Sequence, residues 1–128
     1  MEVIHLDHIV LTVRDIEKTI AFYTSILGME KEIFGEGRIA LKFGNQKINL
    51  HQVGNEFQPQ AKSPTSGSAD LCFIMKTPLN EAINQVKKCG IEIIAGPVMM
   101  TGANGSIYSF YFRDPDLNLI EVANEIES

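Results

Sequence analysis

The sequence predicts an α+β fold built from two βαβββ modules, residues 1–53 and residues 69–128, within a single domain. Both halves follow the same order of patterns, which is a short apolar strand, an amphipathic helix and three further strands. Between them, residues 54–68 hold two of the five prolines and many small polar residues, a composition typical of a linker. Repeats of this length generate pseudo-symmetric sheets.

The first module begins with a predicted strand at residues 5–13, which is short, apolar and rich in β-branched side chains. Asp15 is the expected N-cap of a helix over residues 16–27, where apolar residues recur near the helical period. Gly28 supplies the left-handed residue that ends this helix. Glycine-containing turns then separate three predicted strands, at residues 29–34, 38–43 and 47–53.

The second module restarts the pattern with a strand at residues 69–75. Thr77 is the expected N-cap of a helix over residues 79–89, with a proline in its first turn and Gly90 at its end. Three strands are predicted to follow, at residues 91–95, 106–113 and 118–124.

Two connections in the second module have clear turn chemistry. Residues 113–118, RDPDLN, predict a tight hairpin turn. Arg113 could hold this turn or bind an anionic substrate, and holding the turn is favoured. Residues 101–105, TGANG, predict a flexible loop at the rim of the sheet. Tyr111 lies among aromatic residues, which favours a packing role.

Composition limits the classes of function. The chain has 128 residues, 45% of them apolar and 21% charged, as is ordinary for one globular domain. A net charge of −5 with scattered basic residues argues against nucleic acid as a partner, and the absence of a long apolar run argues against a membrane span. The N-terminus lacks the pattern of a signal peptide, and Cys72 and Cys89 do not form a disulfide framework. We therefore expect a cytoplasmic protein with reduced thiols.

Four potential metal ligands, His8, His51, Asp70 and Glu121, stand inside the strand patterns. His8 and Asp70 open the first strand of each half, whereas His51 and Glu121 lie in the last. Strand alternation places each on the face opposite the apolar one that covers the helix, so a curled sheet would bring them to its concave side. A lone strand histidine is more often structural, and a rim salt bridge is the ordinary role for such a glutamate. Their recurrence in one layout favours a metal site.

Three segments, LDHIVLTVRDIEKTIAFYTSILGM, KINLHQV and YFRDPDLNLIEV, resemble the vicinal oxygen chelate superfamily. That superfamily includes glyoxalase I, bleomycin- and fosfomycin-resistance proteins and extradiol dioxygenases. The resemblance covers nearly the whole chain and is closest to small glyoxalase-domain-containing proteins. It implies a mixed sheet cupped around a divalent metal, and homodimers in which modules of both subunits line each site.

In bacterial glyoxalase I the metal ligands run His, Glu, His, Glu along the chain. This sequence offers His8, His51, Asp70 and Glu121, the same total with the middle pair exchanged in type. The resemblance implies a lyase or isomerase whose metal acts as a Lewis acid on a small substrate with adjacent oxygens, such as a methylglyoxal–thiol hemithioacetal. Glu121 would be the base. Zinc or nickel is favoured, iron, cobalt and manganese also suit such ligands, and the thiol stays open.

Two alternatives remain at this stage. His8, His51 and Glu121 match the two-histidine, one-carboxylate set of an iron-dependent ring-cleaving dioxygenase. The second alternative is a non-catalytic resistance protein that binds a drug in the same cupped sheet. The intact ligand set weighs against this alternative.

Overall fold

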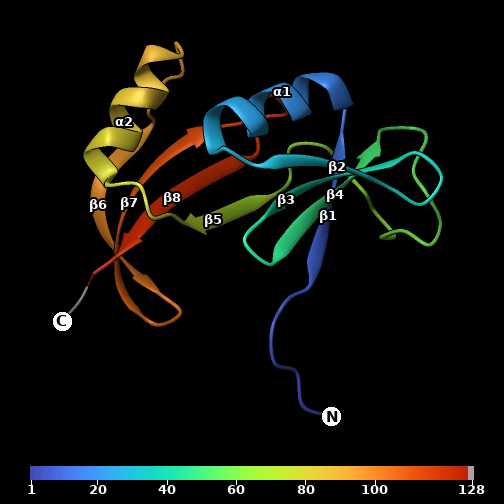
Figure 1. Ribbon diagram of the computed structural model, residues 1–128, viewed down its shortest axis with the longest axis horizontal. Helices are drawn as coiled ribbons and strands as arrows, with labels where there is room; N and C mark the ends of the chain where they lie inside the picture. Colours follow the sequence, from blue (N-terminus) through green and yellow to red (C-terminus); the bar gives the residue numbers. More distant parts are fainter. Residues whose placement is uncertain (127–128) are drawn as a thin grey trace. The chain divides into compact units, whose positions relative to one another are not determined.

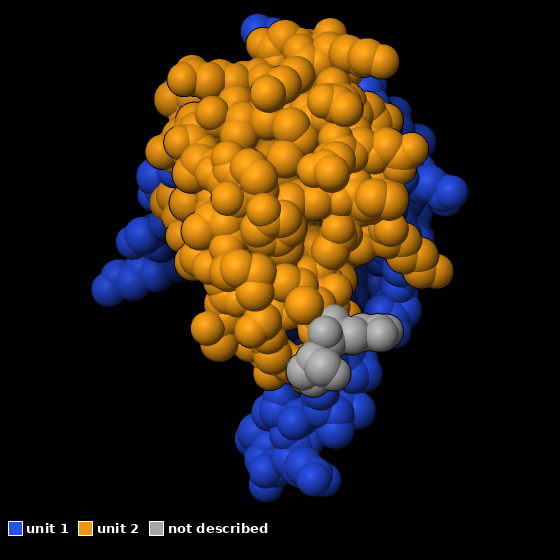
Figure 2. All heavy atoms as spheres, turned by 90° about the vertical axis from the view of Figure 1, so that its left-hand side faces the viewer, with its two compact units in different colours: residues 1–67 blue, residues 68–128 orange. Residues whose placement is uncertain are grey.

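The protein is described by a computed structural model, which covers residues 1–126; residues 127 and 128, the end of the predicted second module, lie outside the described part. The chain divides into two compact units, residues 1–67 and residues from Ser68 onward (Figure 2). Neither helix in residues 1–126 has the length and hydrophobicity needed to cross a membrane.

The first unit is a four-stranded mixed sheet with one helix (Figure 1). Its elements are β1 (His8–Val13), α1 (Ile16–Leu27), β2 (Glu30–Phe34), β3 (Arg38–Phe43) and β4 (Gln46–Gln52). The strand order is β1-β4-β3-β2, with β1 parallel to β4 and the other pairs antiparallel. Its core is formed by buried side chains of the strands and of α1, including Leu11, Val13, Tyr23, Leu41, Ile48 and Leu50.

Both predicted ends of α1 are confirmed. The Asp15 Oδ1 atom accepts a hydrogen bond from the backbone N–H of Lys18 at 3.1 Å, which satisfies one of the free donors of the first turn. Gly28 has a φ of 66°, and its N–H donates to the Tyr23 carbonyl. This left-handed conformation is open to glycine at no steric cost, so the chain leaves the helix there.

The second unit repeats the first. Its elements are β5 (Asp70–Ile74), α2 (Leu79–Lys88), β6 (Ala95–Gly102), β7 (Gly105–Arg113) and β8 (Leu119–Glu125). The strand order is β5-β8-β7-β6, again with the first strand parallel to the last and the rest antiparallel. The predicted α+β fold of two βαβββ modules is therefore confirmed.

The predicted cap of α2 is wrong. The N-cap position is occupied by Pro78, and Thr77 makes no capping hydrogen bond there. Instead, Asn124 of β8 accepts from the Leu79 N–H at 2.9 Å and donates to the carbonyls of Met75 and Thr77 at 3.2 and 2.9 Å. The cap comes from a residue distant in sequence, which local turn chemistry cannot reveal.

The position of β6 also differs from the prediction. Residues 91–94 are not a strand, and β6 runs over Ala95–Gly102, so the predicted loop at 101–105 is instead the tight end of a β6–β7 hairpin. A proline at position 97 hides this strand from a sequence pattern. The structure accommodates it because β6 is an edge strand whose pairing shifts between Ala95 and Val98.

The turn before β8 is held as predicted, because Arg113 Nη1 donates to the Leu117 carbonyl at 3.2 Å. Leu117 itself has a φ of 71° and a side chain that is 60% exposed. An ordinary residue in this left-handed region costs about 1–2 kcal/mol, whereas asparagine tolerates it.

Leu117→Asn is therefore expected to raise the free energy of unfolding by about 1 kcal/mol, measured by chemical denaturation. The control is Leu6→Asn, which changes an exposed leucine that precedes β1 and should alter stability by less than about 0.5 kcal/mol. A Leu117→Asn variant no more stable than the parent protein would show that this backbone is not strained.

Candidate functional site

Glu121 occupies the middle of the sheet of the second unit. It stands on β8 directly opposite Cys72 of β5 and Tyr111 of β7. Its Oε2 atom is buried and has no hydrogen-bond partner within residues 1–126. Leaving a buried acceptor unsatisfied costs about 1–3 kcal/mol, which a bound cation or donor would remove. This orphaned oxygen marks Glu121 as a functional candidate.

Asp70 lies on the same face of the same sheet as Glu121. It begins β5 and pairs with Leu119, two register positions before Glu121. That offset corresponds to about 7 Å along the strand. Asp70 is exposed, unlike Glu121. The two predicted carboxylate ligands of this unit are thus close neighbours on one face.

The two residues opposite Glu121 are held in their protonated forms. Cys72 is exposed by surface area, but partial burial of its thiol, followed by the charge of Glu121, raises the pKa of that thiol to about 11. Burial and hydrogen bonding to Glu121 likewise raise the pKa of the Tyr111 hydroxyl. Both groups therefore face the carboxylate as potential donors at neutral pH. The role of Tyr111 beside Glu121 was missed from sequence, although counting back across the 113–118 turn would have placed the two opposite each other.

The raised pKa of Cys72 predicts slow alkylation. In a Cys89→Ser variant treated with a chelator, the iodoacetamide rate is expected to rise with pH toward a midpoint near 11, because the thiolate is the nucleophile. Glu121→Gln should lower this midpoint, since the Glu121 charge is one cause of the shift. If Glu121→Gln leaves the midpoint unchanged, the Glu121 carboxylate is not a cause of the raised pKa of the Cys72 thiol.

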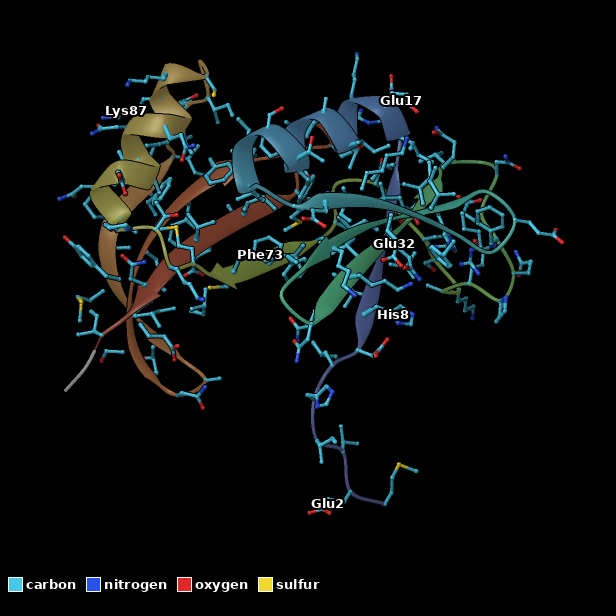
Figure 3. All side chains as sticks on the ribbon, viewed as in Figure 1. Glu2, His8, Glu17, Glu32, Phe73 and Lys87 are labelled. Atoms are coloured by element: carbon cyan, nitrogen blue, oxygen red, sulfur yellow. The ribbon has the colours of Figure 1, made fainter. Side chains whose placement is uncertain are left out.

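In the first unit, His8 opens β1 (Figure 3). Its Nδ1 donates to the Asp7 carboxylate at 2.8 Å, and this hydrogen bond lowers the pKa of Asp7. In the neutral imidazole, a proton on Nδ1 leaves the lone pair of His8 on Nε2. Histidines that bind metals are commonly oriented by a carboxylate in this way.

His51 is buried in β4, with 3% of its surface exposed. Burial and the neighbouring Arg38 guanidinium lower its pKa, against a weaker opposing effect of Glu56, so the imidazole is neutral. Its Nε2 lies 3.5 Å from Arg38 Nη2, at the limit of hydrogen bonding. A neutral imidazole is the form that binds metals, but here its Nε2 faces a cation. The assignment of His51 as a ligand stays a prediction.

The register of β1 and β4 adds a residue that sequence reasoning missed. His8 pairs with Lys47 and Thr12 pairs with His51, so the two histidines are four positions apart, about 13 Å along the strand. In the second unit, Glu121 lies two residues after Leu119, the partner of Asp70. In the first unit, the residue two positions after Lys47, the partner of His8, is Asn49, so Asn49 occupies the position equivalent to Glu121. Asn49 is 5% exposed, and its Oδ1 also lacks a partner within residues 1–126. The two sheets thus carry an orphaned oxygen at the same place.

Among the residues that the structure describes, no three side chains of His, Cys, Asp or Glu gather closely enough to bind one ion. The ligand set expected from the sequence therefore stays a prediction.

Comparison with known proteins places these observations in a family. The model of the glyoxalase/bleomycin resistance protein/dioxygenase superfamily matches residues 5–122. The virulence protein STM3117 of Salmonella typhimurium is 54% identical over 121 residues, which are 94% of this chain and 84% of that protein. The glyoxalase domain-containing protein RDO1 of Mycosarcoma maydis is 53% identical over 119 residues, which are 93% and 67% of the two chains.

Solved structures agree. An integron cassette protein from the mobile metagenome of V. cholerae is 59% identical, with a TM-score of 0.96 over 98% of both chains. The fold is shared with a lactoylglutathione lyase from Agrobacterium tumefaciens (TM-score 0.71, 23% identity, 94% and 92% of the chains). It is also shared with a fosfomycin resistance protein, FosX, from Listeria monocytogenes in complex with Mn(II) (TM-score 0.66, 23% identity, 95% and 90%). This chain therefore belongs to the glyoxalase/bleomycin resistance protein/dioxygenase superfamily.

Proposed function

We propose that this protein is a metal-dependent lyase or isomerase of the glyoxalase type. Its substrate would be a small molecule with two adjacent oxygens, such as the hemithioacetal of methylglyoxal with a thiol. The observation that carries the proposal is the Glu121 carboxylate, whose buried Oε2 has no partner in residues 1–126 and which faces two protonated side chains. Membership of the superfamily supports it.

His8, His51, Asp70 and Glu121 would hold the divalent metal, and the two carboxylates would balance its charge. Such an ion fits the buried oxygens of Glu121 and Asn49 and the Nε2 of His8, none of which has a hydrogen-bond partner within residues 1–126. The metal would supply a Lewis acid that polarises the substrate oxygens. Zinc or nickel suits the mixed nitrogen and oxygen donors, and the FosX neighbour binds Mn(II).

Glu121 would move the proton in this reaction. Its carboxylate takes the proton from the carbon that bears the hydroxyl and sulfur, and it returns a proton to the neighbouring carbonyl carbon. R–CO–CH(OH)–SR′ thereby becomes R–CH(OH)–CO–SR′, an isomerisation that requires no oxidant. Tyr111 and Cys72 would orient the carboxylate from both sides by donating toward it.

The test combines metal analysis of natively purified protein with assays of methylglyoxal hemithioacetals of several thiols. About one zinc or nickel ion per site and formation of the 2-hydroxyacyl thioester are expected. Metal-loaded protein that turns over none of these substrates, in an assay where a known glyoxalase works, would overturn the proposal. Bound iron with oxygen uptake on catechols would favour a ring-cleaving dioxygenase instead.

We further propose that the protein is a homodimer of cytoplasmic chains, with each site shared between the first unit of one subunit and the second unit of the other. Mixing inactive His8→Gln and Glu121→Gln variants then restores one intact site in each mixed dimer, giving about a quarter of wild-type activity. Each variant alone is the control. If every site lies within one chain, mixing restores nothing.

A further inference from the structure

Arg38 is held among aromatic side chains on the sheet face of the first unit that also carries His51. Its Cζ lies 5.2 Å from the ring centroid of Phe34, its partner across β2 and β3, and 4.7 Å from that of Phe57. Phe57 belongs to the segment after β4 and also packs edge-on against His51 at 5.6 Å. The guanidinium is thus positioned by two rings and by the imidazole, which reduces the entropy lost when it binds a ligand.

Most donors of this guanidinium have no acceptor within residues 1–126. Of its five N–H groups, the one described hydrogen bond reaches only His51, at 3.5 Å. No carboxylate oxygen within residues 1–126 lies within 4 Å of it. Rings stacked on a guanidinium leave its in-plane edge available, and that edge matches the two oxygens of a carboxylate or phosphate group.

A second cation lies against the same ring. Lys47 Nζ is 3.7 Å from the centroid of Phe34, and Lys47 is half-buried. Glu32, labelled in Figure 3, is an acid on this face, but its Oε2 is buried and has no hydrogen-bond partner in the described part of the chain. Aromatic rings rather than carboxylates therefore hold both cations, and no carboxylate among the described residues forms a direct ion pair with either of them.

We propose that Arg38 and Lys47, held by Phe34 and Phe57, form an anion-binding subsite that takes the carboxylate or phosphate group of a small-molecule ligand. As a selector of anionic substrates the subsite deepens the proposed function and rests on it. Anion binding itself involves only residues of the first unit and requires no metal, so it is measurable independently.

The experiment is an NMR titration of the full, chelator-treated chain with succinate and, separately, with inorganic phosphate at constant ionic strength. The Nε–Hε signal of Arg38 and the backbone amide signals of β3 and β4 are expected to shift saturably with at least one of them, and the amide signals give Kd in the variants that lack Arg38. Arg38→Met should raise Kd by about tenfold or more, and Arg38→Lys, which keeps the charge but not the planar edge, by an intermediate factor. Lys62→Met, which removes an exposed charge from the segment after β4, is the matched control and should change Kd less than about twofold.

The two probes distinguish the ligand classes. Saturation by succinate alone indicates a carboxylate ligand, and saturation by phosphate alone indicates a phosphoryl ligand; either supports the subsite. The proposal is overturned if neither probe gives a saturable shift. It is also overturned if Lys62→Met raises Kd as much as Arg38→Met does. Anion binding that persists in a protein without hemithioacetal turnover would remove the proposed reaction and leave the subsite standing.

Discussion

Replacing Glu121 with glutamine is expected to lower kcat/KM for hemithioacetal isomerisation by about a thousandfold. Glutamine keeps the shape of the side chain on β8, so the strand should pair with β5 and β7 as before. It removes both the base that transfers the proton and a negative charge that favours a divalent cation. The rate should be measured with metal content determined on the same sample, because the two losses have different origins.

The matched control for this variant is Glu125→Gln. Glu125 lies on the same strand and on the same alternating face, but it is exposed. Its replacement should leave the rate within about twofold of the parent, since an exposed charge contributes little. A Glu121→Gln protein with full metal content and turnover within tenfold of the parent would exclude Glu121 as the base.

Replacing Asp114 with alanine is expected to have the largest effect on stability, about 3 kcal/mol, which corresponds to a fall in Tm of roughly 10 °C. Asp114 is 3% exposed at the turn before β8. Its Oδ1 accepts from the backbone N–H groups of Asp116 and Asn118 at 2.9 Å each, and its Oδ2 accepts from Asn118 Nδ2 at 2.8 Å. Alanine would leave these donors without their acceptor in a buried turn.

This turn also bears on the candidate site. Asn118, which Asp114 holds, accepts from the Ala69 N–H at 2.8 Å and so ties the start of β5 to the start of β8. Asp114→Ala should therefore lower activity in conditions where the protein is still folded, because the register of Asp70 against Glu121 loosens.

Two variants serve as controls, with unfolding followed by calorimetry. Asp114→Asn keeps an oxygen acceptor and should cost less than alanine, and Pro115→Ala, an exposed change in the same turn, should cost less than about 1 kcal/mol. An alanine variant within 1 kcal/mol of the parent would mean that the turn is held by other contacts.

The elements predicted well from sequence are those specified by neighbouring residues. The helix over residues 16–27 has its cap at Asp15 and its stop at Gly28, and both act within one turn of the chain. The elements predicted poorly depend on distant partners. The strand β6 carries a proline that only an edge position accommodates, and α2 is capped by Asn124 from β8.

The candidate site also has a part that the sequence predicted and a part that only strand pairing decided. Glu121 and Asp70 could be placed on one face from strand alternation, because side chains alternate with a fixed period of two. Alternation does not distinguish Asn49 from His51, since both lie on the same face of β4. Only the pairing of His8 with Lys47 makes Asn49 the counterpart of Glu121.

The sequence by itself determined the two βαβββ modules, the family and the presence of histidines and carboxylates in the strands, because repeats, periodicity and segment patterns are properties of the chain. The tertiary structure decided which side chains meet: Tyr111 and Cys72 beside Glu121, and Arg38 between Phe34 and Phe57. The physical reason is that strand register and loop packing follow from how buried side chains fit across strands, and no single segment contains that information.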